Sequence, residues 1–263
     1  MIEMKREIPI GVSDCLLGND VRFDGDRRGF ALIYDQLKAY LTLRTVPAEV
    51  TVGLNDIAQV EDFSTLCGLI LCEAQPRESV QQLIQAMPWL PVEEAGQLQQ
   101  PLIRQHLITR ICALWELNQI LVDGLTRGAL IHYHSRYKLI LLAHSQPEDR
   151  KIGPFVAAID KLPIQDFFLA YRIQLMSLLS IPATRQNHTN VLQHVQGYFR
   201  PYLTSIQRQE LAGLIDQYRQ GLQSLQAPMA LLKHYLAEYP DAYLQQQRYF
   251  DPYPEALNLS YGI

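Results

Sequence analysis

A cysteine near the N-terminus stands where a sheet protein could use a thiol. Cys15 follows an apolar, β-branched run, residues 8–12, which predicts a buried first strand, and it precedes a turn ending at Gly18. In open α/β sheets ligands bind at the ends of the strands. A thiol at that edge could take part in ligand binding, whereas the plainer interpretation is a small buried hydrophobe. The residues alone leave both interpretations open.

Three other cysteines could join Cys15. Cys67 and Cys72 are five residues apart in an apolar run, and an extended strand would turn their side chains to opposite faces. Cys112 lies in a helical pattern and is expected in the core. Four cysteines without a paired C-x-x-C motif are a weak metal signal.

The segments around Cys15 resemble a known enzyme family. Residues 13–18 and 22–25 are similar to the opening of the thiouracil desulfidases, which have a Ser-x-Cys-Leu-Leu-Gly turn followed by an Arg-Tyr-Asp-Gly segment. The resemblance implies a 4Fe-4S cluster, held by three cysteines, whose open iron accepts sulfur from a thiolated uracil. It also implies that fused relatives act on 4-thiouridine in tRNA.

The chain departs from the family pattern at the second ligand. The family's Cys-Pro-Glu-Val segment matches residues 46–50, where Pro47 stands at the cysteine position and Glu49 is retained. In an active enzyme Glu49 is the candidate proton-transfer group, at the end of a strand expected over residues 49–54.

The third ligand can be placed in two registers. One keeps Cys67, whereas the other aligns the family's Ser-Pro-Ser-Cys-Gly loop with residues 75–79 and puts Glu78 in place of the thiolate. The strand pattern of residues 68–71 favours the second register. We therefore expect no complete cluster and no cofactor. The alternative is a retained 4Fe-4S cluster on Cys15 with Cys67 or Cys72.

A second resemblance covers residues 90–263, which are similar to the YbgA domain, a family of uncharacterised helical proteins often fused behind a desulfidase domain. Its landmarks here are residues 90–94, 132–138, 188–194, 197–198 and 249–254. Two of these segments hold polar pairs at helical spacing, His134 with Lys138 and Asn190 with His194. The candidate nucleic-acid-binding residues are His134, Arg136, Lys138, His188, Asn190 and His194.

Such residues can hold a phosphate or a base edge through charge-assisted hydrogen bonds, although an exposed polar stripe is the plainer interpretation.

The distribution of charge does not decide whether the protein contacts RNA. The net charge is −4, but residues 1–99 hold 8 Lys/Arg against 15 Asp/Glu, whereas residues 100–263 hold 15 against 12. A mildly basic second part is consistent with RNA contact and equally with two solvated surfaces.

Tyrosines gather near the C-terminus between Tyr198 and Tyr261, beside glutamines 245–247. Such rings can stack on unpaired bases. They are more typical of a C-terminal tail packed across a bundle, with the rings as anchors.

The elements predict an α+β fold, with a small N-terminal α/β unit, a Rossmann-like remnant, followed by a larger all-α bundle of about six helices. These helices are expected over residues 103–122, 129–144, 165–179, 188–199, 204–222 and 228–238. The expected domains are residues 1–87, shortened and desulfidase-like, a linker at 88–101, and residues 102–263, helical. A helix is expected over residues 30–43. No apolar run reaches the roughly 20 residues of a membrane span, so we expect a cytoplasmic protein with reduced cysteines and no membrane partner.

Common enzyme motifs are missing from the sequence, including the P-loop, the dinucleotide fingerprint, the His-Glu-x-x-His zinc motif and the Gly-x-Ser-x-Gly elbow. Three functions remain. The first is a divergent relative of the tRNA 4-thiouridine desulfidases that lacks a complete cluster and binds tRNA. The second is an active 4Fe-4S desulfidase. The third is a helical protein-interaction module linked to DNA photorepair.

Overall fold

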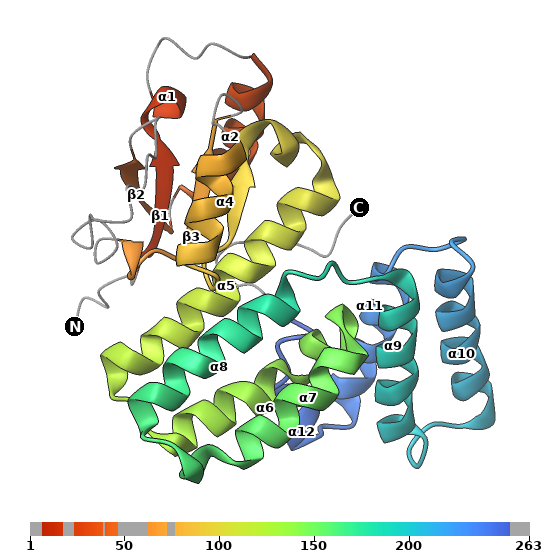
Figure 1. Ribbon diagram of the computed structural model, residues 1–263. Helices are drawn as coiled ribbons and strands as arrows, with labels where there is room; N and C mark the ends of the chain where they lie inside the picture. The colour runs from red at the N-terminus through yellow and green to blue at the C-terminus, as the bar shows by residue number, and fades with distance from the viewer. Residues whose placement is uncertain (1–6, 18–23, 39, 47–62, 73–76, 253–263) are drawn as a thin grey trace, which may run out of the picture. The chain divides into compact units, whose positions relative to one another are not determined.

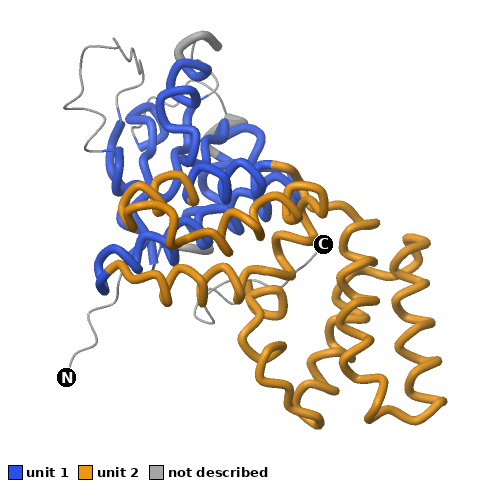
Figure 2. Tube along the Cα trace, turned by 60° about the horizontal axis from the view of Figure 1, so that its bottom comes forward, with its two compact units in different colours: residues 1–124, 172–180 blue, residues 125–171, 181–263 orange. Residues whose placement is uncertain are grey.

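The computed structural model describes residues 7–17, 24–38, 40–46, 63–72 and 77–252, and the chain divides into two compact units (Figure 2). Unit 1 comprises residues 1–124 and 172–180 and contains the sheet. Unit 2 comprises residues 125–171 and 181–263 and is helical in its described part. The expected combination of a small sheet and a larger helical part is confirmed.

Unit 1 is built on a parallel sheet of four strands in the order β2-β1-β3-β4 (Figure 1). These are β1 (Ile8–Ser13), β2 (Leu41–Val46), β3 (Gly68–Leu71) and β4 (Val92–Glu94). Every residue of β3 is buried, and so are all but one of β1. Continuous burial is what a parallel sheet covered on both faces requires, and the strands predicted around residues 8–12 and 68–72 are confirmed.

The described helices of unit 1 are α1 (Asp14–Leu17), α2 (Asp24–Leu37), α4 (Arg77–Ala86), the 3₁₀ turn η1 (Ala95–Gln99) and α5 (Pro101–Asp123). Gly29 of α2 packs so closely on η1 that a Cβ would collide with the carbonyl oxygen of Ala95. α5 begins with a proline, whose missing N–H costs nothing at that position, and ends before Gly124, which has a φ of 109°.

The helix expected over residues 30–43 ends at Leu37, and residues 41–46 form β2. The predicted helix was too long because apolar residues at helical spacing, Ile33, Leu37 and Leu41, continue past its end at Leu37. The segment Leu41–Val46 has β-branched residues at three of its six positions and pairs with β1 over its whole length. The strand expected over residues 49–54 lies outside the described residues. The segment 88–101, predicted as a linker, contains β4 and η1.

Unit 2 holds α6 (Arg127–His144), α7 (Gln146–Ala157), η2 (Ile159–Lys161), α9 (Arg185–Phe199), α10 (Ser205–Arg219), α11 (Gln226–Glu238) and α12 (Ala242–Gln245). α8 (Ile164–Leu179) begins in unit 2 and ends in unit 1. Side chains cap several helices, among them Thr126, Ser145, Thr184 and Thr204. No helix in the described part of the chain is both long and apolar enough to cross a membrane.

Candidate functional site

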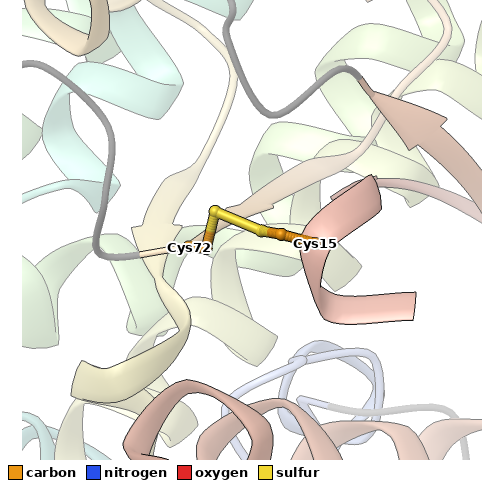
Figure 3. Close-up of a disulfide and its surroundings, with 2 residues drawn as sticks. All are labelled: Cys15 and Cys72. Atoms are coloured by element: carbon orange, nitrogen blue, oxygen red, sulfur yellow. A yellow bond between two sulfur atoms is a disulfide. The ribbon is translucent and has the colours of Figure 1, made fainter. Parts of the chain in front are cut away.

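Two of the predicted ligand cysteines meet at the carboxyl edge of the sheet. Cys15 is the second residue after the end of β1 and lies in α1, and Cys72 follows β3 directly. The two are joined by a disulfide, with Cα atoms 6.8 Å apart and a sequence separation of 57. Figure 3 shows Cys15 projecting from α1 toward Cys72 at the end of β3. The sequence offered both cysteines as candidate ligands, but the expectation of reduced cysteines is wrong for this pair, because the two sulfurs are bonded to each other.

The strand order gives this edge a functional meaning. β1 pairs with β2 on one side and with β3 on the other, so the chain passes from β1 to one neighbour and later returns to the opposite one. At such a reversal of strand order the connections leave in opposite directions and open a crevice beyond the carboxyl ends, where ligands bind in open parallel sheets. The disulfide lies at this position.

Ser13, the last residue of β1, is fully buried, and its hydroxyl has no hydrogen-bond partner among the described residues. A buried hydroxyl without a partner costs about 1–3 kcal/mol, so such a group calls for a physical reason. Ser13 is two residues before Cys15 in the sequence, so its hydroxyl is a hydrogen-bonding group close along the chain to the disulfide.

The other cysteines lie away from this pair. Cys67 is 1% exposed, and its sulfur accepts a hydrogen bond of 3.8 Å from the amide of Asn118. Burial raises the pKa of Cys67 to about 12, so it stays a neutral thiol. Cys112 is buried in α5, as its helical spacing predicts. Neither cysteine behaves as a thiolate ligand.

A three-cysteine iron-sulfur cluster does not fit the described residues. Only two sulfurs come together, and they are bonded to each other. No group of three or more His, Cys, Asp or Glu side chains in the described ranges is placed to hold a metal ion. Glu49, the candidate proton-transfer group, lies outside those ranges, and so does the side chain of Glu78.

In unit 2, the landmark segment 132–138 lies on α6, where His134 is buried and His132 is exposed. His134 is 8% exposed and shares a hydrogen bond of 3.1 Å with the hydroxyl of Tyr171. Burial, helped by the nearby charge of Lys138, lowers the pKa of His134 to about 4, so the ring is neutral at pH 7. The ammonium of Lys138 donates to both oxygens of Asp149, each at 2.8 Å.

Two residues just before the C-terminal landmark, Gln247 and Arg248, bind the landmark segment of α6. Buried Gln247 accepts from the N–H of Leu139 at 3.2 Å and donates to the carbonyl of Ser135 at 2.8 Å. These two backbone groups would pair with each other in an uninterrupted α-helix, so the amide of Gln247 bridges a step of α6. One residue later, the N–H of Arg248 donates to the carbonyl of Arg136 at 2.9 Å.

His188 completes this network on α9. Its Nδ1 lies 2.9 Å from the hydroxyl of Tyr249, which is fully buried. Burial lowers the pKa of His188 to about 4, and it raises the pKa of Tyr249 well above its ordinary value. The landmark segments of α6, of α9 and of the C-terminus therefore converge inside unit 2. The expected packing of C-terminal rings across the bundle is confirmed for Tyr249 and Phe250.

Asn190 and His194 lie differently, because both are exposed on α9. With Tyr198 they recur every four residues along one helical face. The ring of His194 meets the edge of Tyr198 at 5.5 Å between centroids, and Tyr198 stacks on Tyr243 at 5.8 Å.

Four residues beyond Tyr198, Tyr202 stacks on Tyr239 at 5.4 Å with an angle of 13° between the rings. We call these residues the aromatic row: His194, Tyr198, Tyr202, Tyr239 and Tyr243.

The described residues thus define an α+β protein with a cysteine pair at its sheet edge and a helical unit ordered by its own landmarks. Residues 138–254 match a family described as a protein of unknown function, DUF1722. The chain is 56% identical over 156 residues to an uncharacterised protein, YbgA, of Escherichia coli (strain K12). The match covers 59% of this chain and 92% of that relative, and the chain therefore belongs to the YbgA family. No solved structure matches the chain.

Proposed function

We propose that this protein binds RNA, with tRNA as the expected ligand, through the aromatic row of unit 2. In this proposal the chain is a divergent relative of the tRNA 4-thiouridine desulfidases, with a cysteine pair where the family has a complete iron-sulfur site. The observation that carries RNA binding is the pair of stacked tyrosine contacts, Tyr198 with Tyr243 and Tyr202 with Tyr239. Tyr202 is exposed, and the other three rings are half-buried.

Accessible tyrosine rings are suited to unpaired bases. Tyr202 is 60% exposed, an unusual setting for a large ring in a packed helical unit. Each base stacked on an aromatic side chain contributes about 1–3 kcal/mol to binding, with little dependence on its identity. Tyr198 and Tyr202, each in a stacked pair, are four residues apart and could stack on successive bases. Stacking of this kind favours a single-stranded loop over a duplex.

Two positively charged side chains lie near Tyr202 in the sequence. Arg200 and Arg208 flank Tyr202 in sequence and are exposed, and a guanidinium nitrogen of Arg208 lies 3.5 Å from the carbonyl oxygen of Arg200. Among the described residues, neither arginine forms an ion pair. The row also has an acidic neighbour, because the hydroxyl of Tyr239 donates to Glu238. We therefore expect about two phosphate contacts and a modest salt dependence.

Fluorescence anisotropy with labelled, unmodified tRNA tests the stacking. We expect Tyr202→Ala to weaken binding about 5- to 100-fold, the range that corresponds to the loss of one stacked base. The matched control is Tyr34→Ala, since Tyr34 is an exposed tyrosine in a stacked pair with Phe30, but in unit 1. Equal affinities for both variants and the unaltered chain would refute the assignment.

Salt titrations test the charges. Each phosphate contact with a single strand contributes about 0.7 to the slope of log K against log salt concentration. Arg200→Gln and Arg208→Gln should each reduce the slope by about that amount. Arg219→Gln is the control, because Arg219 is exposed but already paired with Asp216. An unchanged slope in the first two variants would exclude the arginines from the interface.

A desulfidase activity is the second candidate, and the meeting of Cys15 with Cys72 at a ligand-binding edge favours it. The described residues supply two thiols rather than three, so the enzyme would need a further ligand. Iron and acid-labile sulfide, measured on the whole chain after reconstitution without oxygen, decide the matter. About four irons per chain, lost in Cys15→Ala, would support the enzyme. Iron-free protein would exclude a cluster-dependent activity.

A further inference from the structure

We propose that Cys15 and Cys72 form a thiol–disulfide exchange site whose reaction partner is a protein or small molecule that carries a dithiol. The inference rests on unit 1 and is independent of RNA binding by unit 2. Two observations lead to it: the unequal burial of the two cysteines, and their place at the carboxyl edge of the sheet.

The two cysteines differ in accessibility. Cys72 is 5% exposed, whereas Cys15 is half-buried on the short helix after β1. Exchange begins when a thiolate approaches one sulfur of a disulfide, so access decides which sulfur reacts. The geometry assigns Cys15 as the sulfur that is attacked and Cys72 as the leaving sulfur.

The disulfide lies where a reactive group could meet a ligand, at the carboxyl edge of the sheet. Unit 1 already has a continuous apolar core, with Ile10, Val12 and Ile70 fully buried in its two central strands. β1 and β3 are also paired directly by their backbones. A disulfide between cysteines 57 residues apart also stabilises the fold by restricting the unfolded chain. Exchange is inferred from its place, because it holds two sulfurs at the carboxyl edge where parallel sheets bind ligands.

The expected compartment supports the same assignment. The sequence predicts a cytoplasmic protein, and disulfides in the cytosol are usually transient, serving catalysis or redox sensing. The buried free thiols of Cys67 and Cys112 take no part, because burial shields both.

The reaction balances as an exchange between two dithiol/disulfide couples. A thiolate of the partner attacks the sulfur of Cys15, a mixed disulfide forms, and the sulfur of Cys72 leaves as a thiolate that takes up a proton. The second thiol of the partner then loses its proton and attacks the partner's own sulfur in the mixed disulfide, releasing Cys15, which is protonated in turn. The protein gains two electrons and two protons, and the partner becomes a disulfide.

Peptide mapping of the whole chain tests the order of attack. The oxidised protein is exposed briefly to reduced glutathione under native conditions, quenched with acid, and digested. We expect glutathione on Cys15 at least 10-fold more often than on Cys72, with Cys67 and Cys112 unmodified. Equal labelling of Cys15 and Cys72, preferential labelling of Cys72, or a disulfide that is reduced only after denaturation would overturn the proposal.

A second measurement uses single variants with Ellman's reagent. The free Cys15 of Cys72→Ala should react at least 10-fold faster than the free Cys72 of Cys15→Ala. Far-UV circular dichroism of both variants checks that the fold is kept, and the mapping of the unaltered chain remains decisive where a variant fails to fold. Equal rates in two folded variants would contradict the assignment of Cys15.

Discussion

The two units use their polar residues in opposite ways. In unit 1 the potentially reactive cysteines lie just after the ends of strands. Cys15 is bonded to Cys72 at the carboxyl edge, where parallel sheets bind ligands. In unit 2 two polar landmarks, His134 and His188, bond to buried tyrosine hydroxyls, and nearby Gln247 bonds to backbone groups of α6. Asn190 and His194 are exposed. A polar motif at helical spacing can therefore define a family through its architecture, while reactivity lies elsewhere in the chain.

The comparison predicts that unit 2 is the acid-sensitive half. The pKa values of His134 and His188 are lowered to about 4 in the folded protein, and an unfolded histidine has its ordinary value near 6.5. The unfolded state binds more protons between these values, so the stability that both neutral rings contribute is present above pH 6.5. It is lost as the pH falls toward 4, by about 3 kcal/mol for each histidine.

Urea unfolding followed by circular dichroism, from pH 7 to pH 4, measures this loss. His134→Gln should reduce the dependence by about 1.4 kcal/mol per pH unit. The same substitution at His132, which is exposed on α6, controls for the removal of a histidine. Both tryptophans, Trp89 and Trp115, lie in unit 1, so their fluorescence separates the two halves. A pH dependence confined to the fluorescence signal would contradict the prediction.

Gln247→Leu should destabilise unit 2 by about 2–4 kcal/mol. The substitution removes both hydrogen bonds that bridge Ser135 and Leu139, and it leaves two backbone groups of α6 to pair again or remain unsatisfied. The measurement is urea unfolding followed by circular dichroism. Gln246→Leu is the control, because Gln246 is the exposed neighbour. Equal stability of the two variants would show that the bridge does not hold α6.

Lys138→Met should cost about 2 kcal/mol, a smaller amount because the lysine side chain is 37% exposed. It leaves the carboxylate of Asp149, whose side chain is 6% exposed, without its cation. Lys151→Met removes the exposed pair with Glu148 and should cost at most about 0.5 kcal/mol. Thermal unfolding of both variants compares the two pairs, and a larger loss in Lys151→Met would reverse the argument.

Local pattern predicts much of this fold. The β-branched run before Cys15 and the apolar stretch 68–71 are strands, and the apolar spacing of residues 103–122, 165–179 and 228–238 marks helices that the structure confirms. α7 was missed, since Pro147 and Pro154 interrupt its pattern. Proline is tolerated in the first turn of a helix, and Ser145 caps this one.

The site depends on long-range contacts, which local pattern does not contain. Nothing in the spacing of Cys15 and Cys72 predicts that β1 and β3 lie side by side, because strand order is set by the packing of the whole sheet. Gln247 sits in a run of three glutamines that is typical of solvated surface, and its burial follows from the docking of Tyr249. The sequence likewise does not indicate that Asp149 pairs with Lys138, because the pair forms only when α7 packs on α6.

The central claim is that RNA contacts unit 2 at the aromatic row, and photo-crosslinking tests it most directly. RNA that carries 4-thiouridine in a single-stranded loop is irradiated with the whole chain, and the adducts are mapped by mass spectrometry. We predict adducts on the peptides that contain Tyr202 and Tyr239, reduced in Tyr202→Ala and unchanged in Tyr34→Ala. Adducts confined to the sheet edge near Cys15, or no adducts at all, would contradict the account.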